Sequence, residues 1–486
     1  MWDWSIIRTR PKLQAPFVSW YLAVKARWQP AAGELKRYPH FDLPLSAQEL
    51  VEIANDPDRV ASNAFFPFLV NRISWIPYRG DGQREPKVRL IRYASRRDAA
   101  IYTRYRALLS DFYENQLADA GLGDTVLGYR RIPVRPGAAT GKCNIHFARE
   151  AFEAVLQYGD CCAVVMDIAS FFDNIDHARL KSAWCRTIGK DRLPADHFAL
   201  YKSLTRHASV NRKEALARLG LNREARGRKP LPIQLCSPKK FRVKIAGQGA
   251  DYSSLINLNR NPFGIPQGAA VSDVLANIYL LDFDRQMQEM VGQLGGIYRR
   301  YSDDLFILVP GGDAAGLQIS EWADELLRGH GDQLQIQPNK SQIVAFARNG
   351  DASRVMSVAT DRGRNGLEYL GFRFDGRQVY LRDSTLSRLY RKLTHACKKE
   401  VNRIQRRYPD KSSQALFGKV DFQRLESRFG RVEDFEPGDV KTWTFWTYAR
   451  RADRVLGTLG KPVMRQVRRY RAFMRRTVKE LLESRP

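Results

Sequence analysis

The alternation of apolar and polar positions predicts strands in four parts of the chain. Residues 87–93 alternate with a period of two, and residues 161–168 form a short apolar, β-branched run. Residues 298–308 read as two apolar arms around an acidic turn, and 366–382 have the pattern of a β-hairpin. A strand at each of these places, mixed with helices, predicts an α+β fold.

Apolar spacing typical of helices fills much of the remaining chain. We expect helices at about 98–117 and 146–157, and a mostly helical region after about 383. The pattern divides the chain into an N-terminal extension (1–60), a central domain (61–375) and a C-terminal helical domain (376–486). Residues 186–260 are the least regular part of the central domain and are expected to be a basic insertion.

Composition narrows the class of protein. The chain has 486 residues, 44% of them hydrophobic, which excludes disorder as its main state. Lysine and arginine number 80 against 52 acidic residues, so the net charge of +28 favours a polyanionic partner, nucleic acid before an anionic membrane. No apolar run reaches about 18 residues and no export signal begins the chain, so we expect a soluble, cytoplasmic protein without a membrane partner.

Cysteine usage agrees with this environment. The six cysteines form no C-x-x-C pair, which argues against zinc ribbons and against a disulfide framework. Cys161 and Cys162 begin an apolar run and are expected to be small buried side chains.

Three aspartates occupy positions that folding alone does not require. Asp167 ends the strand predicted at 161–168, and Asp303 and Asp304 lie in the acidic turn between two strands. Aspartate is a common turn residue, so an isolated pair would be read simply as a turn. Three carboxylates on two strands could instead hold two Mg²⁺ ions that clamp the attacking and leaving oxygens of a phosphoryl transfer.

Further motifs accompany the aspartates, and together they resemble the reverse transcriptases, specifically the bacterial enzymes related to group II intron proteins. The resemblance covers about 85–375, with five motifs in the family's order: residues 167–177 (DIASFFDNIDH), 264–272 (GIPQGAAVS), 301–304 (YSDD), 338–341 (PNKS) and 367–372 (LEYLGF). It implies a right-hand polymerase fold, with fingers, a palm built on an antiparallel sheet, and an α-helical thumb.

The resemblance also implies roles for individual residues. Asp167 and Asp303 would be the principal ligands of both Mg²⁺ ions, with Asp304 assisting and Mn²⁺ as a substitute metal. Lys340 would protonate the departing pyrophosphate, although an exposed lysine with no such role is the alternative. The primer grip would comprise Tyr369, Leu370 and Gly371.

Five other residues would bind the incoming nucleotide. Lys87 and Arg89 match the fingers residues that hold the triphosphate. Phe172 stands five residues after Asp167, where a bulky side chain would exclude a ribose 2′-hydroxyl; the alternative is a core phenylalanine, which we prefer for Phe171. Gln267 and Gly268 would line the nucleotide pocket and template path, glycine permitting close backbone approach.

The chain departs from the family in several places. The second motif usually continues with Ser-Pro, whereas Asp273 follows Ser272 here and puts an extra carboxylate near the template path. The sequence shows neither the segments specific to retrons nor a Cys/His cluster that would indicate an endonuclease. About 110 residues follow the primer grip, which is enough for a thumb but not for a thumb and a further enzyme domain. The resemblance is therefore nearest to the stand-alone, defence-associated enzymes of the abortive-infection and unknown groups.

Basic residues are concentrated toward the C-terminus. Residues 381–486 carry 27 lysines and arginines against 12 acidic residues, and segments 388–392, 398–407 and 466–476 repeat them at helical spacing. We expect a thumb that tracks the phosphates of a duplex. The aromatic residues at 443–448 could stack on bases, but packing between helices is the favoured interpretation.

These features predict an RNA-directed DNA polymerase, a nucleotidyltransferase that joins dNTPs to a 3′-hydroxyl. Its partners would be an RNA template, DNA product and a dedicated noncoding RNA, and its role antiphage defence; a homo-oligomer or partner protein is left open. One alternative keeps the active site but starts synthesis from a protein primer or without a template. An alternative from another class is a maturase-like RNA-binding scaffold.

Overall fold

The computed structural model describes residues 27–75, 86–222, 229–360, 366–430 and 444–484. Within these residues the chain divides into two compact units. Unit 1 combines Met1–Ser74, Val88–Gly121 and Phe172–Leu281, and unit 2 combines Trp75–Lys87, Leu122–Phe171 and Asp282–Pro486. Each unit is built from segments that are distant in sequence, so contacts between remote parts of the chain hold both together.

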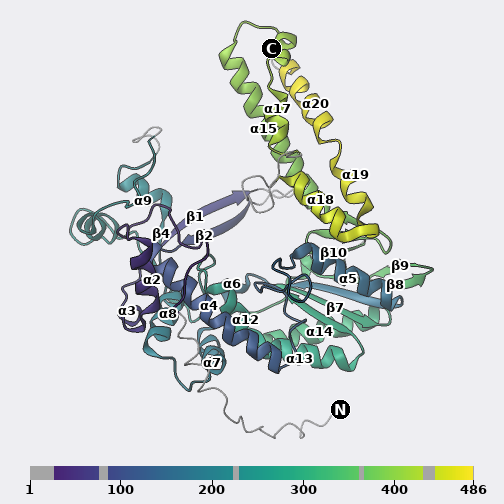
Figure 1. Cartoon of the computed structure of the whole chain (residues 1–486), viewed down its shortest axis with the longest axis horizontal. Coiled ribbons are helices and arrows are strands. Elements are labelled where there is room, and N and C mark those ends of the chain that lie inside the picture. Colours follow the sequence, from purple (N-terminus) through teal and green to yellow (C-terminus); the bar gives the residue numbers. More distant parts are fainter. Residues whose placement is uncertain (1–26, 76–85, 223–228, 361–365, 431–443, 485–486) are drawn as a thin grey trace. The chain divides into compact units, whose positions relative to one another are not determined.

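Unit 1 combines helices with a small mixed sheet of strand order β2-β1-β4-β5 (Figure 1). The strands are β1 (Phe68–Trp75), β2 (Lys87–Tyr93), β4 (Ala208–Asn211) and β5 (Asn257–Leu258), with β1 and β4 parallel. The helices are α2 (Ala47–Asn55), α3 (Pro57–Ala61), α4 (Arg96–Asp119), α6 (Phe171–Asn174, whose first residue belongs to unit 2), α7 (His177–Thr187), α8 (Ala195–Thr205), α9 (Arg212–Arg218), α11 (Pro238–Lys240), the π-helix η1 (Phe241–Ile245) and α12 (Ser272–Tyr279).

Unit 2 is built on a five-stranded antiparallel sheet of order β6-β7-β3-β8-β9. The strands are β3 (Cys161–Asp167), β6 (Ile297–Tyr301), β7 (Asp304–Pro310), β8 (Gln342–Asn349) and β9 (Ala352–Val358). Helix α5 (Asn144–Tyr158) shares a core with Cys161, Ala163 and Val165 on one sheet face, and α14 (Asp313–Gly329) packs on the other, where Gly316 meets Cys162. Both faces are covered, which is why β3 is apolar throughout.

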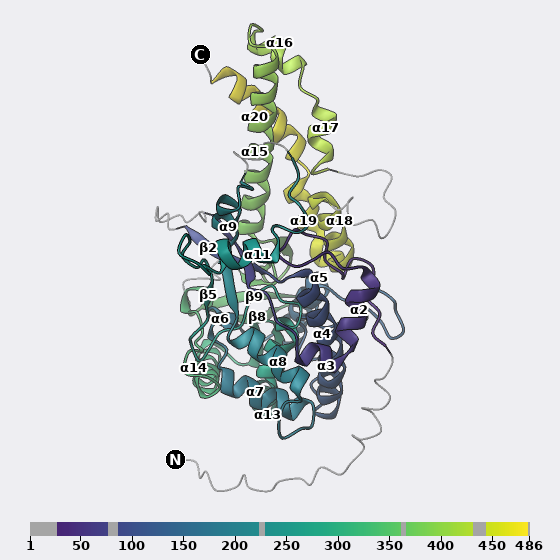
Figure 2. The same ribbon diagram turned by 90° about the vertical axis from the view of Figure 1, so that its left-hand side faces the viewer.

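A second antiparallel sheet leads into the C-terminal helices of unit 2. Strands β10 (Leu367–Tyr369), β11 (Phe372–Phe374) and β12 (Val379–Leu381) precede α15 (Asp383–Arg407), which packs along α20 (Tyr470–Glu483) (Figure 1). Around them lie α16 (Ser413–Gly418), α17 (Phe422–Ser427), α18 (Phe445–Leu456), η4 (Gly457–Gly460) and α19 (Lys461–Val467), with α16 at the end of α15 away from the sheet (Figure 2). One continuous apolar core joins the five-stranded sheet to these helices.

Most of the predicted elements are confirmed. Strands occupy 87–93 and 161–167, helices occupy 96–119 and 144–158, and the region after 383 is helical. The α+β class is confirmed: within unit 2 a five-stranded antiparallel sheet is joined to a set of C-terminal helices. The predicted domain boundaries stay a prediction. No helix in the described residues is both long and apolar enough to span a membrane.

Two details differ from the sequence-based prediction. The hairpin predicted at 366–382 has three strands, because the chain turns again after Phe374. The basic insertion, predicted to be the least regular part of the central domain, contributes Val210, Ala215, Leu235 and Ile245 to a small buried core that also contains Phe41 and Leu69 from earlier in the chain. Enough apolar side chains lie between its arginines and lysines to contribute to this core.

Burial of a histidine in unit 1 makes the stability of the fold dependent on pH. His207 is buried, its Nδ1 donates to the Leu204 carbonyl at 2.9 Å, and its ring edge meets Phe68. Burial lowers the pKa of His207 to about 4, with nearby Arg92 adding to the effect. The folded chain therefore keeps this ring neutral at pH values where an unfolded chain would protonate it.

We predict that His207 makes unfolding easier in mild acid. The unfolded chain takes up a proton near pH 6.5, so the stability present above that pH is lost progressively as the pH falls toward about 4. Between pH 7.5 and 5 the loss should be about 2 kcal/mol, and His207→Asn should remove it from the pH dependence of denaturant unfolding. The exposed His395→Asn is the control; an unchanged pH dependence in His207→Asn would contradict the prediction.

Candidate active site

Strand pairing brings two of the three predicted aspartates to the same end of the sheet. Asp167, the last residue of β3, is paired directly with Asp304, the first residue of β7. Asp303 precedes Asp304 in the two-residue turn between β6 and β7, and its carbonyl accepts a hydrogen bond from the Ile168 amide at 2.9 Å. The turn that bears Asp303 is thereby fixed to the chain just after Asp167.

Burial and repulsion from the neighbouring carboxylates both raise the pKa of Asp304. Burial raises the pKa of Asp304 to about 7, and the negative charges of Asp303 and then Asp167 contribute to the rise. The cations Lys340 and Arg382 act in the opposite direction. This end of the sheet therefore favours an added positive charge.

Two basic side chains partly supply that charge. Lys340, at the end of η2 (Pro338–Lys340), forms an ion pair between Nζ and Oδ1 of Asp167. Arg382 donates from Nε to Oε2 of Glu368 at 2.8 Å and lies close enough to Asp304 to affect it. Lys340 was predicted from the sequence to act here, whereas Arg382 was not, because no motif includes it.

The turn that carries Asp303 has unusual backbone geometry. Ser302 has φ of +61°, a conformation that favours glycine, and its hydroxyl donates to Oη of Tyr129 at 3.1 Å. In the described chain four non-glycine residues have positive φ: Tyr129, Ser170, Ser302 and Leu370. Ser302 directly precedes Asp303 and contacts Tyr129, Ser170 lies three residues after Asp167, and Leu370 lies in the predicted primer grip. Backbone strain of this kind commonly collects at functional sites.

A neighbouring glycine allows a second segment to lie against this turn. A Cβ on Gly128 would stand 2.5 Å from the Ser302 amide nitrogen, too close for any side chain. The Leu127 amide donates to the Arg300 carbonyl at 2.7 Å, and the Arg300 amide donates to the Thr125 carbonyl at 2.8 Å. The segment around 125–129 therefore holds the catalytic turn from the side.

A buried ion pair supports the turn from within. Arg300 and Asp284 are both fully buried, and the guanidinium donates to both carboxylate oxygens at 2.7 and 2.6 Å. Asp284 also accepts from the Tyr298 hydroxyl at 2.8 Å, and Arg300 donates from Nη1 to the Ser302 carbonyl at 3.0 Å. Arg300 thus links the core of the unit, through helix α13 (Leu281–Gln293), to the residue before Asp303.

The donor set suits Mg²⁺ better than a metal that needs a complete protein cage. Among the described residues no group of three or more His, Cys, Asp or Glu side chains that could hold a metal ion is present. Mg²⁺ usually binds through one or two carboxylates and takes its other ligands from water and substrate phosphates. Carboxylates that raise one another's proton affinity, as at Asp304, fit that requirement.

The predicted primer grip is a tight hairpin beside the carboxylates. Leu370 (φ +45°) and Gly371 (φ +91°) form the two-residue turn between β10 and β11, with the positive φ values of a type I′ turn. The Leu370 carbonyl accepts from Nδ2 of Asn144 at 3.0 Å, which ties the turn to α5. Tyr369 is buried against Phe306, so among the three predicted primer-grip residues only the two in the turn are partly exposed.

Four of the five predicted nucleotide-binding residues, Arg89, Phe172, Gln267 and Gly268, belong to unit 1, and Lys87 belongs to unit 2. Phe172 is half-buried and its carbonyl accepts from the Ile265 amide at 2.8 Å, whereas Phe171 is buried, as its preferred interpretation required. Gln267 and Gly268 are exposed and lie against β2: a Cβ on Gly268 (φ +121°) would stand 2.3 Å from the Arg92 carbonyl oxygen.

Two basic residues on β2 were predicted to hold the triphosphate. Arg89 is exposed on this strand, and the side chain of Lys87 lies outside the described part of the chain. Arg92, which was not predicted, places Nη1 3.8 Å from Oδ1 of Asp173. It lies three residues along the same strand from Arg89, but the sequence pattern did not distinguish it from the other basic residues there.

Asp273, the departure from the family pattern, has a cationic partner in the same unit. Arg106 of α4 donates from Nε to both carboxylate oxygens at 2.9 Å, and the Val274 amide donates to Oδ1 at 2.7 Å. Burial raises the pKa of Asp273 above its usual value, and the charge of Arg106 offsets only part of this rise. The pair joins α12 to α4, and the place of Asp273 near a template path stays a prediction.

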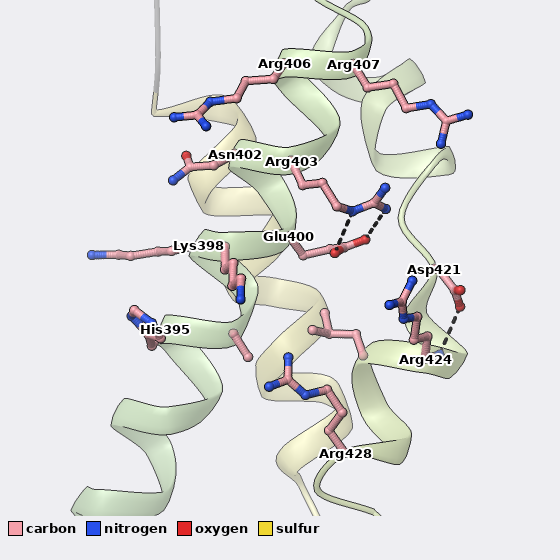
Figure 3. A pocket seen from close by; sticks show the side chains of 13 residues that line it. His395, Lys398, Glu400, Asn402, Arg403, Arg406, Arg407, Asp421, Arg424 and Arg428 are labelled. Carbon is pink, nitrogen blue, oxygen red and sulfur yellow. Dashed lines mark hydrogen bonds and ion pairs between the residues drawn. The ribbon is translucent and has the colours of Figure 1, made fainter. Parts of the chain in front are cut away.

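A basic groove lies between α15 and α17 in unit 2 (Figure 3). Its volume is about 960 Å³, and seven cationic side chains line it: Lys398, Lys399, Arg403, Arg406, Arg407, Arg424 and Arg428. Glu400 holds Arg403 with two hydrogen bonds of 2.6 and 3.1 Å, and Asp421 caps α17 through the Arg424 amide at 2.9 Å. Like charges gathered around a concavity favour a polyanionic ligand.

The aromatic residues near the start of α18 pack within unit 2. Trp446 lies 5.7 Å from Tyr470 of α20, and Tyr448 lies 6.4 Å from Phe372 of β11, measured between ring centroids. The favoured interpretation, packing between helices, therefore holds for Trp446, whereas Tyr448 packs against a strand. Trp443 lies outside the described residues.

Comparison with known proteins finds similarity in structure but none in sequence. No protein-family model matches the chain, and no curated protein matches it. Among solved structures, a telomerase from Candida tropicalis truncated from its C-terminal domain is similar, with 8% identity and a TM-score of 0.39 over 68% of this chain and 59% of that one. The apo telomerase from the same organism is 11% identical, with a TM-score of 0.38 over 84% of this chain and 62% of that one.

A viral polymerase is similar at the same level. The RNA polymerase complex inside a dsRNA virus gives 10% identity and a TM-score of 0.36 over 67% of this chain and 26% of that one. The chain therefore spans about three fifths of the two telomerase chains and a quarter of the viral one. At these identities and TM-scores, residue roles rest on the geometry of this chain alone.

We predict that the buried ion pair is essential to the stability of unit 2. Asp284→Asn leaves the Arg300 guanidinium buried without a counter-charge and should lower the free energy of unfolding by about 3–5 kcal/mol. The matched control is Asp282→Asn, two residues away, which breaks an exposed pair with Arg285 and should cost at most about 1 kcal/mol. Denaturant unfolding of both variants makes the comparison, and equal losses would contradict the role assigned to Arg300.

Proposed function

We propose that the chain is an RNA-directed DNA polymerase whose reaction centre is formed by Asp167, Asp303 and Asp304. The observation that carries the proposal is the direct pairing of Asp167 with Asp304 across β3 and β7, with Asp303 in the adjoining turn. The arrangement gathers acidic oxygens at one end of an antiparallel sheet. Such a site suits phosphoryl transfer, in which positioning and charge stabilisation supply most of the catalysis.

In the proposed reaction a primer 3′-oxygen attacks the α-phosphorus of a dNTP, and the bond to pyrophosphate breaks. Mg²⁺ bound by the aspartates would activate the attacking hydroxyl and neutralise the departing phosphates. Asp304 is a carboxylate whose ionisation responds to neighbouring cations. Lys340 places an ammonium proton donor beside Asp167, which supports its proposed role toward pyrophosphate.

Other residues would select and orient the substrates. Phe172 is proposed to exclude a ribose 2′-hydroxyl, and Arg89 and Lys87 to hold the triphosphate. Gly268 and Gln267 would carry the templating base, since glycine lets the loop approach β2 closely. The basic groove of α15 and α17 would bind the phosphates of the template–primer duplex.

The finer parts of the proposal follow from the family resemblance. These are a bacterial, stand-alone enzyme of antiphage defence and a dedicated noncoding RNA. The alternative of protein-primed or untemplated synthesis drew on Asp273, and the Arg106 contact removes that support by balancing its charge. The presence of Asp167, Asp303 and Asp304 at one end of the sheet argues against the scaffold alternative, because RNA binding alone does not need these carboxylates.

We predict that Asp303→Asn abolishes nucleotide addition. Loss of one carboxylate that stabilises the reaction by several kcal/mol should slow dNTP incorporation on an RNA-templated primer at least about a hundredfold. The measurement is single-nucleotide extension by purified protein in Mg²⁺, with Asp351→Asn, an exposed aspartate after β8, as the matched control. Phage plating of cells carrying each variant tests the defence role.

Three outcomes would overturn parts of this account. Incorporation that is unaffected by nuclease removal of RNA would favour untemplated synthesis. Undiminished biological activity of Asp303→Asn with unchanged RNA binding would favour the scaffold. Equal rates for Asp303→Asn and Asp351→Asn would contradict the proposed centre itself. Sequencing of co-purifying nucleic acid identifies the template and any dedicated RNA.

We predict that the basic groove contributes salt-dependent affinity for nucleic acid. Replacing Arg424 and Arg428 with glutamate should weaken binding of an RNA–DNA duplex and reduce the slope of log K against log salt by about 2, roughly one for each phosphate that the groove no longer neutralises. The double variant Arg285→Glu and Arg328→Glu changes the net charge equally on exposed helices and should leave the slope unchanged. Fluorescence anisotropy over a salt series measures both, and equal effects of the two double variants would show that only net charge matters.

A further inference from the structure

A cavity of about 350 Å³ lies between α5 and the strands that carry the aspartates, and none of the three aspartates lines it. Its walls combine polar and apolar side chains, and the apolar part consists of Phe147, Ala151 and Ala154 from α5 together with Ile297 of β6 and Phe306 of β7. We call it the α5 cavity. Its volume falls within the range of about 300–1,000 Å³ that small-molecule sites usually occupy.

The α5 cavity adjoins the candidate active site along β7. Side chains two residues apart in a strand face the same side, so Phe306 lies on the same sheet face as Asp304, about 7 Å along the strand. Arg299 pairs with Phe306, and Tyr301 with Asp304, on the adjacent strand β6. A molecule in this cavity would therefore contact the strands that position the catalytic turn.

Two polar groups in the cavity have unused hydrogen-bonding capacity. The Tyr369 side chain is only 2% exposed, and its hydroxyl has no hydrogen-bond partner among the described residues. The Arg299 guanidinium donates from Nη1 to the Tyr298 carbonyl at 2.9 Å, and no carboxylate within the described residues forms an ion pair with it. Buried polar groups are rarely left unpaired, so the Tyr369 hydroxyl calls for a ligand, and the half-buried Arg299 offers that ligand a cation.

The remaining charges narrow the chemistry of that ligand. Lys142 and Glu150 neutralise one another in an ion pair of 2.6 Å. Asp124 also lines the cavity, but it is exposed, so water screens its charge more strongly than that of the half-buried Arg299. Arg299 is then the cation for an incoming anion, with the Tyr369 hydroxyl as a second donor. The aromatic rings of Phe147 and Phe306 provide an apolar surface for the rest of the molecule.

We propose that the α5 cavity binds a small amphipathic anion, with a flat apolar body between α5 and the sheet and its acidic group on Arg299 and Tyr369. None of the three aspartates lines this site, which shares only Tyr369 with the predicted primer grip, and binding there does not depend on the proposed reaction. A ligand held by α5, β6, β7 and β10 together binds only the folded chain, and so raises the unfolding temperature. It also restrains the two strands on which the catalytic turn is built.

The test uses 1-anilinonaphthalene-8-sulfonate, a flat apolar anion, as the probe for the full chain. Fluorescence titration should show saturable binding of one molecule per chain. Arg299→Met should weaken it at least about tenfold, and Tyr369→Phe about fivefold, because a charge-assisted hydrogen bond contributes more than a neutral one. Ala154→Phe, which fills the cavity, should abolish the saturable component.

Matched variants separate the cavity from general dye binding and from misfolding. Arg354→Met on β9 and Tyr380→Phe on β12 should leave the affinity unchanged. Arg299→Lys keeps the charge and should retain affinity within about threefold, and melting curves without dye show that each variant is folded. Wild-type affinity in both Arg299→Met and Ala154→Phe, or no saturable binding to the wild type, would overturn the proposal.

Discussion

Mutual repulsion among three carboxylates is the constraint that the rest of the candidate site has to offset. Backbone pairing of β3 with β7 places Asp167 opposite Asp304 whatever their charges, and the β6–β7 turn adds Asp303. The cost appears in Asp304, whose pKa burial and its neighbours raise to about 7. Lys340 offsets part of the repulsion, and the remaining negative charge is what a divalent cation and substrate phosphates would use.

A turn under this repulsion needs rigid support, and the structure supplies it from three sides. The buried Arg300–Asp284 pair holds the Ser302 carbonyl from below, and Gly128 lets the preceding segment touch the Ser302 amide. The Asp303 carbonyl is bonded to the Ile168 amide beyond β3. Burying a charged pair costs free energy unless its hydrogen-bond geometry is good. The bidentate contact of Arg300 with Asp284 therefore indicates that the pair fixes the position of the β6–β7 turn and does not serve stability alone.

The pattern of apolar and polar residues predicted the strands that carry this site. It did not predict the side-chain partners of the aspartates, because those contacts join residues far apart in sequence. The apolar run before Asp167 and the two arms around the acidic turn indicated strands, and the motif order indicated that Asp167 and Asp304 come together. The partners of Asp273 and Asp304, namely Arg106 and Arg382, are 167 and 78 residues away in sequence, and nothing local marks them. The burial of Tyr369 could not be predicted from the sequence either, because a tyrosine in a hairpin can face solvent or pack into the core.

The central claim is that Asp167, Asp303 and Asp304 form one divalent-cation site that is completed by nucleotide. Electron paramagnetic resonance of Mn²⁺ titrated into the protein with a non-hydrolysable dNTP tests it most directly. The account predicts about two bound Mn²⁺ per chain, dependent on the nucleotide, and loss of at least one of them in Asp167→Asn. Mn²⁺ binding that is unchanged in Asp167→Asn and Asp303→Asn would contradict it.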